Sequence, residues 1–227
     1  MSKKLKHVFF DLDHTLWDFE KNSALAFAEI FNKNKIEVDL LQFLKSYKPI
    51  NNLYWSQYRK DEVSKENLRF GRLNDTFKEL KINVSDAQIN TLADDYISYL
   101  PKHNFLFDDV TSTLISLQKK YVLHIITNGF SEVQQLKLNN SNINNYFTTV
   151  TTSEEVGVKK PHPEIFKYAL HKAQAIASES LMIGDNLETD ILGAEASGIQ
   201  TILYDIDNSI VYSGNKIKKL KQILDLI

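Results

Sequence analysis

The sequence contains no cysteine among its 227 residues. Disulfides, thiolate catalysis and cysteine-ligated zinc are therefore excluded, and a reducing compartment is favoured. Glycine and proline are also scarce, with seven and four residues respectively. Domain divisions must therefore be inferred from hydrophobic periodicity rather than from Gly- or Pro-rich linkers. No apolar stretch approaches the roughly 18 residues that a membrane-spanning helix needs.

An excess of charge of one sign is missing too, because the formal net charge is only -2. Binding to a nucleic-acid backbone or an anionic membrane surface requires a clustered basic excess. The one lysine cluster alternates with apolar residues, as on the exposed face of a terminal helix; it comprises Lys216, Lys218, Lys219 and Lys221. We therefore expect no nucleic-acid polymer and no membrane as a partner. Both a monomer and a homodimer remain open.

The first apolar run, from His7 to Asp13, has the character of a short buried parallel strand ending in carboxylates. The core of a secretion signal would not tolerate those aspartates, so we expect a cytoplasmic protein. From about residue 18 to residue 100 nearly all signals are helical. Ser85 and Gln88 have the spacing of a capping box, and Pro49 is expected to break or kink the second helix.

From about residue 105 onward the pattern alternates between strand and helix. A second capping box is expected at Ser131 and Gln134, and Pro163 suits the first residue of another helix. Strands are expected at 122–126, 147–152, 181–184 and 201–204. The predicted fold class is α/β, with a doubly wound, Rossmann-like parallel sheet as the core and an inserted helical cap domain. Residues 1–15 and 101–227 would form the core, and residues 16–100 the cap.

Polar clusters follow four of the predicted strand ends. They are Asp11-Leu12-Asp13-His14-Thr15, Thr127-Asn128-Gly129, Lys159-Lys160-Pro161, and Gly184-Asp185 with Asp190 close behind. In doubly wound sheets the ligand binds beyond the carboxyl ends of the strands, so these clusters are expected to converge. One cluster alone would be ordinary loop polarity, but four together predict an acidic pocket that also holds a cation and a hydroxyl.

Such a pocket is suited to phosphoryl transfer. Asp11, Asp185 and Asp190 would crowd negative charges that call for a hard divalent cation, and oxygen ligands favour Mg²⁺. A carboxylate that attacks a phosphoryl group needs its repulsion cancelled. Magnesium, Lys160 and the Thr127 hydroxyl would provide this. The predicted partner is a small-molecule phosphate monoester.

In order and strand position, the four clusters resemble the four motifs of haloacid dehalogenase superfamily phosphatases, over about residues 1–15 and 101–210. The resemblance implies that Asp11 is the nucleophile that becomes an aspartyl-phosphate, and that Asp13 is the general acid and base. Thr127, Asn128 and Lys160 would bind phosphate, Lys160 being chosen because it directly precedes the proline. The metal site would comprise Asp11, the backbone carbonyl of Asp13, and Asp185. Asp190 would orient water or Lys160, although it would also suit a helix N-terminus.

A finer resemblance concerns the substrate. The runs Phe-Phe-Asp-Leu-Asp-His-Thr-Leu-Trp-Asp-Phe, Ile-Thr-Asn-Gly-Phe and Ser-Glu-Glu-Val-Gly-Val-Lys-Lys-Pro are similar to the branch of pyrimidine nucleoside 5′-monophosphatases. This implies a pyrimidine-preferring nucleotidase. In the cap, Trp55 and Tyr58 lie three residues apart on one helical face and are the candidates for contact with the nucleobase, against the simpler interpretation that they belong to the cap core.

Two other functions remain open. A sugar-phosphate phosphatase or a phosphomutase would use the same core motifs. A non-enzymatic phospho-switch or binding module would also combine a phosphorylatable aspartate with a threonine and a lysine. Such receivers have no acid or base two residues after the nucleophile and no large helical insertion. Asp13 and residues 16–100 therefore argue against a switch.

Overall fold

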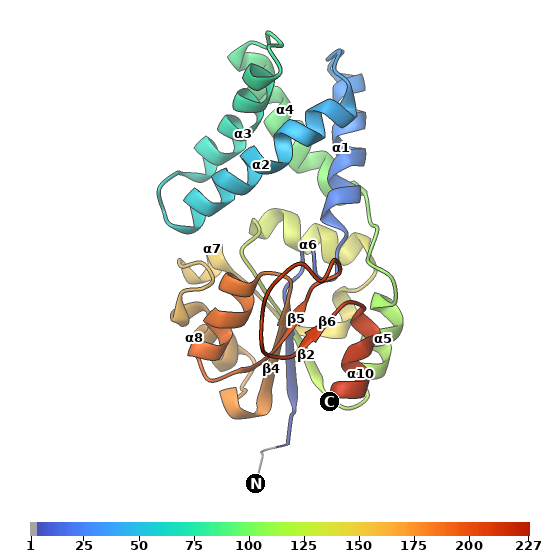
Figure 1. Ribbon diagram of the computed structural model, residues 1–227, viewed down its shortest axis with the longest axis vertical. Helices are drawn as coiled ribbons and strands as arrows, with labels where there is room; N and C mark the ends of the chain where they lie inside the picture. The colour runs from blue at the N-terminus through green and yellow to red at the C-terminus, as the bar shows by residue number, and fades with distance from the viewer. Residues whose placement is uncertain (1–3) are drawn as a thin grey trace. The chain divides into compact units, whose positions relative to one another are not determined.

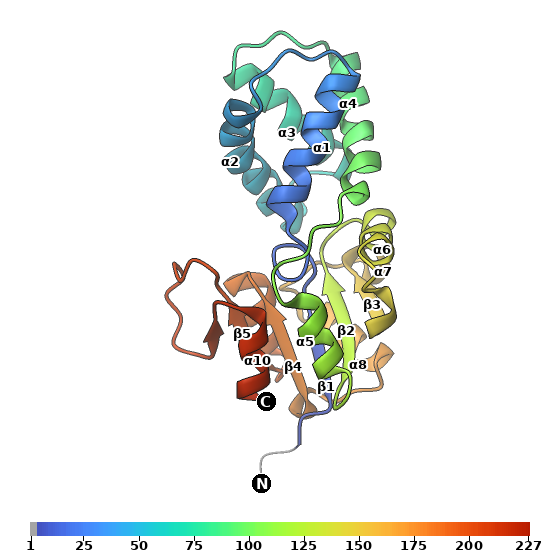
Figure 2. The ribbon, with the colours of Figure 1, turned by 90° about the vertical axis from the view of Figure 1, so that its right-hand side faces the viewer.

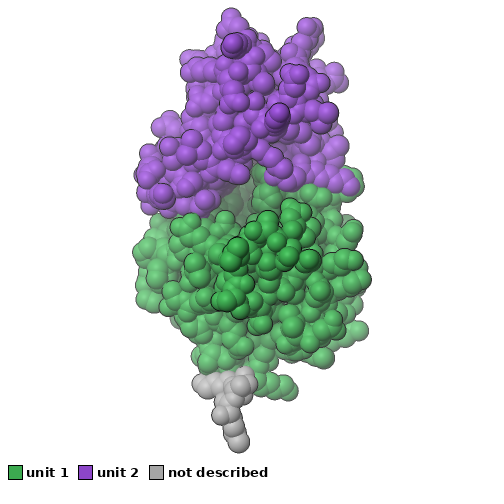
Figure 3. Space-filling view, viewed as in Figure 1, with its two compact units in different colours: residues 1–19, 104–227 green, residues 20–103 purple. Residues whose placement is uncertain are grey.

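The computed structural model describes residues 4–227, which form two compact units (Figure 3). Unit 1 comprises Met1–Phe19 and Asn104–Ile227, and unit 2 comprises Glu20–His103. The domain bounds expected from the sequence, 15/16 and 100/101, stay a prediction. Unit 1 contains the sheet and unit 2 is entirely helical (Figures 1 and 2).

A six-stranded sheet with the order β3-β2-β1-β4-β5-β6 forms the middle of unit 1, and every pairing in it is parallel. The strands are β1 (His7–Phe10), β2 (Val122–Thr127), β3 (Phe147–Thr152), β4 (Ser180–Gly184), β5 (Gln200–Tyr204) and β6 (Lys216–Ile217). The predicted strands lie where the sequence pattern put them. The predicted α/β class, with a parallel Rossmann-like sheet flanked by helices, is confirmed.

Helices cover both faces of the sheet. On one face lie α8 (Pro163–Lys172), α7 (Ser153–Val156) and α9 (Gly193–Ala196); on the other lie α5 (Val110–Leu117) and α10 (Ile223–Leu226) (Figures 1 and 2). Buried Phe9, Ile126 and Met182, from three neighbouring strands, pack against Ile165 and Phe166 of α8. Alternate residues of the same strands are also buried, as expected for a sheet with helices on both sides.

Unit 2 contains α1 (Phe19–Lys33, which begins at the last residue of unit 1), α2 (Leu40–Arg59), α3 (Lys65–Glu79), α4 (Asp86–Tyr99) and η1 (Leu100–Lys102). Its interior is aromatic, with Phe27, Phe43 and Tyr96 among the buried rings. The predicted capping box at Ser85 and Gln88 is present at the start of α4. At Pro49 the sequence predicted a break or a kink. The break is wrong, because α2 continues through Pro49, and the kink stays a prediction. Buried residues on both sides of Pro49 (Phe43, Tyr47, Asn51 and Tyr58) hold the helix together by packing.

Two other local predictions need correction. Ser131 and Gln134 do not form a capping box: the N-cap residue of α6 (Ser131–Asn140) is Phe130, and the N–H of Ser131 donates to Oε2 of Glu154 at 2.7 Å. The lysine cluster does not begin a helix, because Lys216 and Ile217 form the edge strand β6 and helical turns start only at Leu220. Pairing with β5 satisfies the backbone of this segment, which outweighs its helical spacing. Within residues 4–227 no helix is long and apolar enough to span a membrane.

Candidate active site

Asp11 occupies the central position of the site. It directly follows β1. In the sheet, β2 and β3 lie on one side of β1, and β4, β5 and β6 lie on the other side. Its backbone N–H donates to the carbonyl of Ile183 at 2.9 Å, so the residue still continues the sheet register beside β4. A reversal of strand order opens a crevice at the carboxyl ends of the strands. The fold therefore places Asp11 at that crevice.

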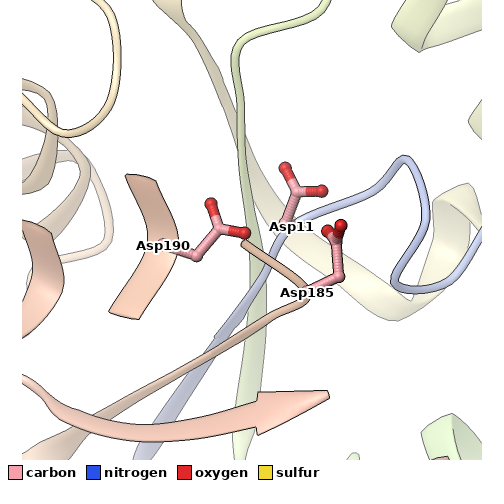
Figure 4. Close-up of side chains that lie close together, drawn as sticks. All are labelled: Asp11, Asp185 and Asp190. Carbon is pink, nitrogen blue, oxygen red and sulfur yellow. The ribbon is translucent and has the colours of Figure 1, made fainter. Parts of the chain in front are cut away.

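Three carboxylates meet there. Oxygen atoms of Asp11, Asp185 and Asp190 all lie within 4.8 Å of one another. Figure 4 shows the three side chains converging from separate segments: the ends of β1 and β4, and the π-helical segment Leu187–Leu192. Gly184 makes this approach possible, because a Cβ atom at that position would collide with the carboxylate of Asp190. The sequence prediction that these residues converge agrees with this geometry.

The ammonium group of Lys160 is buried between two of these carboxylates. Its Nζ lies 2.6 Å from Oδ1 of Asp11 and 2.6 Å from Oδ1 of Asp190, and it also donates to the carbonyl of Ile126 at 2.8 Å. Lys160 is 1% exposed, so these three acceptors replace its hydration. Asp190 is therefore more than a charge near a helix terminus, because it helps to hold Lys160 beside Asp11.

Burial is the largest single influence on the pKa values of Asp11, Asp185 and Lys160. It raises the pKa of the Asp11 carboxyl well above its usual value, an effect that Lys160 opposes and the other two aspartates reinforce. Burial and the charge of Asp190 raise the pKa of Asp185 to about 7. Burial disfavours the charged form of Lys160, but Asp11 and Asp190 outweigh this and raise its pKa. The carboxyls of Asp11 and Asp185 are thus costly to ionise without a further positive charge nearby.

The donor set fits a divalent metal ion. When all are ionised, three carboxylates and one ammonium leave a net charge of -2. All the candidate ligand atoms are oxygens, which hard cations such as Mg²⁺ prefer. Asp185 is held in place by Thr15, whose hydroxyl donates to its Oδ1 at 3.2 Å. Both oxygens of Asp190 already accept hydrogen bonds, Oδ1 from Lys160 and Oδ2 from the N–H of Asn186 at 3.1 Å, so Asp11 and Asp185 are the better candidates for direct metal ligands.

Asp13, two residues beyond Asp11, is held by side chains of α6. Lys137 Nζ donates to its Oδ1 at 2.6 Å, and Gln134 Nε2 donates to its Oδ2 at 3.0 Å. Gln134 Nε2 also donates to the hydroxyl of Thr127, the last residue of β2, at 2.7 Å. Asp13 and Thr127 are therefore connected through one buried amide.

Asn128 differs from Thr127 and Lys160, because both polar atoms of its side chain bond to the backbone of a single residue, Lys160. Its Oδ1 accepts from the N–H of Lys160 at 2.8 Å, and its Nδ2 donates to the carbonyl of Lys160 at 3.0 Å. These two bonds attach the loop that carries Lys160 to the end of β2. The geometry of Asn128 therefore supports a role in placing Lys160.

The predicted substrate contacts in unit 2, Trp55 and Tyr58, lie together on α2. Their rings meet edge to face with centroids 5.7 Å apart. Tyr58 is buried within the helical unit and Trp55 is half-buried. Trp55 is therefore the better candidate of the two for contact with a ligand.

Sequence analysis missed Gln134 and Lys137. The available signal was their position: the buried side of α6 comprises Val133, Gln134, Lys137 and Leu138, so polar residues occupy places that helical periodicity assigns to the interior. A capping box would direct the side chain of Gln134 toward the N-terminus of α6, so that interpretation did not predict its contacts with Asp13 and Thr127.

Comparison with known proteins agrees with this geometry. Residues 8–204 match the family model of haloacid dehalogenase-like hydrolases. The pyrimidine 5′-nucleotidase YjjG of Escherichia coli is 32% identical over 86% of this chain and 83% of its own. A glyceraldehyde 3-phosphate phosphatase of Methanothermobacter thermautotrophicus is 31% identical over 88% of this chain and 85% of its own. The crystal structure of Bacillus subtilis YfnB bound to magnesium superimposes with a TM-score of 0.90, at 28% identity and 99% coverage of both chains.

The match extends from the first segment of unit 1 through unit 2 to residue 204 of the second segment of unit 1. With the parallel sheet and the carboxylate cluster at its switch point, it assigns the chain to a family. The protein belongs to the haloacid dehalogenase-like hydrolases.

Proposed function

We propose that the protein is a magnesium-dependent phosphatase that hydrolyses nucleoside 5′-monophosphates, with a preference for pyrimidines. The observation that carries the proposal is the arrangement around Asp11. A carboxylate at the sheet switch point has Lys160 at 2.6 Å, and Asp13, a second carboxylate, follows two residues later beside Thr127. A nucleophile, a cation, a hydroxyl donor and a proton carrier together are what phosphomonoester hydrolysis requires.

In the first step, a carboxylate oxygen of Asp11 attacks phosphorus and forms an aspartyl-phosphate, while the bond to the leaving oxygen breaks. Asp13 gives its proton to the departing alkoxide. Lys160 and the hydroxyl of Thr127 contact the phosphoryl oxygens and stabilise the charge that they carry. The nucleoside is released with its hydroxyl restored.

In the second step, water attacks the phosphorus of the aspartyl-phosphate. Asp13, now a carboxylate, accepts the proton from that water, and the bond between phosphorus and Asp11 breaks. The products are inorganic phosphate and the regenerated Asp11 carboxylate. When bound by Asp11, Asp185 and the backbone carbonyl of Asp13, magnesium supplies positive charge that offsets the repulsion between the nucleophile and its anionic substrate.

Unit 2 is proposed to act as a cap that supplies the contacts to the nucleoside and restricts access of water. The residues of unit 1 in this mechanism act on the phosphoryl group and on the oxygen atom that leaves with the nucleoside. Recognition of the rest of the nucleoside must therefore come from other residues. Half-buried Trp55 on α2 offers an aromatic face suited to stacking on a base. The pyrimidine preference is supported by the similarity to YjjG.

A second candidate function is hydrolysis of sugar phosphates. It is favoured by the glyceraldehyde 3-phosphate phosphatase, which is about as similar to this chain as YjjG is. The test is release of inorganic phosphate by the purified protein with magnesium from UMP, dUMP, dTMP, AMP, GMP and a set of sugar phosphates. Highest kcat/KM on the pyrimidine nucleotides is expected. Highest kcat/KM on a sugar phosphate would favour the second candidate, and absence of phosphate release from every monoester would contradict both.

A further inference from the structure

We propose that Gln134 and Lys137 of α6 act as a clamp that positions Asp13 for proton transfer. The proposal rests on the phosphatase function proposed above. Each oxygen of the Asp13 carboxylate has its own donor, with Lys137 Nζ at 2.6 Å from Oδ1 and Gln134 Nε2 at 3.0 Å from Oδ2. The two donors are three residues apart, a spacing that places side chains on the same face of a helix. We call this pair the α6 clamp.

The burial of Lys137 shows that its contact with Asp13 is not an incidental surface ion pair. Lys137 is only 2% exposed, and its ammonium also lies 4.3 Å from the ring centre of Trp17 and 5.4 Å from that of Phe19. A buried ammonium is costly unless a carboxylate and other favourable contacts compensate for it. Asp13 and the two aromatic faces provide this compensation. Asp13 is only partly buried and follows the end of β1. Side chains of α6 donate to both oxygens of its carboxylate and hold that group in place.

Gln134 also donates a hydrogen bond to Thr127, in addition to the one that it donates to Asp13. The Thr127 oxygen accepts from Gln134 Nε2 at 2.7 Å and from the backbone N–H of Gly129 at 3.1 Å. A hydroxyl oxygen has two lone pairs, and both are then occupied. The Thr127 proton remains available for donation, which is the polarity that an incoming phosphoryl oxygen requires.

Gly129 makes room for this arrangement. A Cβ atom at that position would overlap the side-chain amide of Gln134. The amide is thus packed directly against the backbone after β2, and its two acceptors, Asp13 and Thr127, are fixed relative to one another. Gln134 and Lys137 are positioning residues, because they act on the substrate only through these partners.

The clamp predicts a loss that depends on the leaving group. In a covalent mechanism kcat/KM reports the steps up to formation of the aspartyl-phosphate, where Asp13 protonates the departing oxygen. An alkoxide needs that proton, whereas p-nitrophenolate leaves without it. Loss of accurate positioning typically costs about 10²-fold. In Lys137→Met, kcat/KM should fall about 10²-fold on UMP and less than about threefold on p-nitrophenyl phosphate. Gln134→Met also removes the hydrogen bond to Thr127, so it should lower kcat/KM on both substrates, with the larger loss on UMP.

Lys137→Arg, which keeps a cation, should recover part of the loss on UMP. Lys167→Met is the matched control, since Lys167 forms an exposed ion pair with Glu164 and has no contact with Asp13; it should match wild type on both substrates. Equal loss on the two substrates would indicate a merely structural role and overturn the proposal. Unchanged kinetics would overturn it too. Should Lys137→Met fail to fold, Gln134→Met provides the same comparison.

If the wild-type protein hydrolyses neither ester, the proposed function is wrong. The α6 clamp can then still be tested by structure, without an activity assay. Crystal structures of the wild type and of Lys137→Met would be compared. A changed or disordered Asp13 side chain in the variant would support the clamp. An Asp13 side chain that keeps its wild-type rotamer without Lys137 would overturn it.

Discussion

The ammonium nitrogen of Lys160 lies 2.6 Å from a carboxylate oxygen of Asp11, and both side chains are buried. Lys160 has a second carboxylate partner in Asp190, also at 2.6 Å. Loss of the Asp11 charge therefore leaves Lys160 paired, while loss of Lys160 leaves three crowded carboxylates without their cation. The two sides of this ion pair are not equivalent, and substitutions should reveal the difference.

Asp11→Asn should abolish phosphate release and leave folding intact, because an amide cannot form the aspartyl-phosphate. Asp13→Asn should also lose turnover, through loss of the proton carrier. Phosphate release and unfolding midpoints check both statements. Mass spectrometry of the trapped intermediate should locate the phosphate on Asp11, and phosphate on any other residue would refute the assignment.

Lys160→Met should destabilise the protein by about 3–5 kcal/mol, the usual cost of removing one partner from a buried ion pair. Asp11→Asn, in contrast, should change the free energy of unfolding by less than about 2 kcal/mol, since Asp190 still compensates Lys160. Urea denaturation of both variants without metal provides the comparison. Equal destabilisation by the two substitutions would contradict the unequal roles inferred here.

Magnesium should raise the unfolding temperature as well as support activity. Binding to the folded state at about 100 times the dissociation constant adds about 2.7 kcal/mol. EDTA should abolish phosphate release, magnesium should restore it, and calcium should restore it poorly, because its longer bonds and higher coordination number misplace the attacking carboxylate. Asp185→Asn should eliminate the thermal shift. Full activity in EDTA would exclude the proposed role of Asp185.

His124 of β2 is buried, and it should contribute to loss of stability in acid. Its ring lies 3.1 Å from His7 and 2.9 Å from Thr149, and burial together with His7 lowers the pKa of His124 from 6.5 to about 4. Between these pH values the unfolded chain binds a proton at His124 that the folded chain does not. This residue should therefore reduce stability by up to about 3 kcal/mol as the pH falls from about 6.5 to 4. The raised pKa values of Asp11 and Asp185 act in the opposite direction, because there the folded chain binds the proton first.

The measurement is the free energy of unfolding by urea as a function of pH. His124→Gln should remove this contribution, because glutamine does not titrate, so the stability of the wild type relative to the variant should fall as the pH falls over this interval. His162→Gln, at the N-cap of α8, is the control. A stability difference between wild type and His124→Gln that does not change between pH 6.5 and 4 would contradict the inferred shift.

Trp55→Ala should raise the KM for pyrimidine monophosphates and leave hydrolysis of p-nitrophenyl phosphate nearly unchanged. The expected penalty is about 1–3 kcal/mol, the usual contribution of a base–aromatic stack. Tyr168→Ala, which removes an exposed aromatic ring from α8 of unit 1, is the control. An equal loss on both substrates would mark Trp55 as part of the packing of unit 2.

The sequence determined the elements that carry the site. Buried strands end at Phe10, Thr127 and Gly184, and their apolar runs, with polar residues at or directly after their ends, could be recognised without a structure. Parallel strands bring such ends to one edge, which is why the convergence of Asp11, Asp185 and Asp190 could be predicted. The capping box at Ser85 was equally legible, because its partner Gln88 lies within the same helical turn.

Only the tertiary structure decided the order of the strands and the partners of side chains far apart in the chain. The same Ser-x-x-Gln spacing that caps α4 at Ser85 fails at Ser131, because Gln134 finds Asp13 and Thr127 instead. Lys137 pairs with Asp13 across 124 positions. Sequence spacing shows only which hydrogen bonds are possible within one turn of a helix. Buried polar groups such as Gln134 and Lys137 instead bond to the partners that lie next to them once the sheet and α6 have packed together.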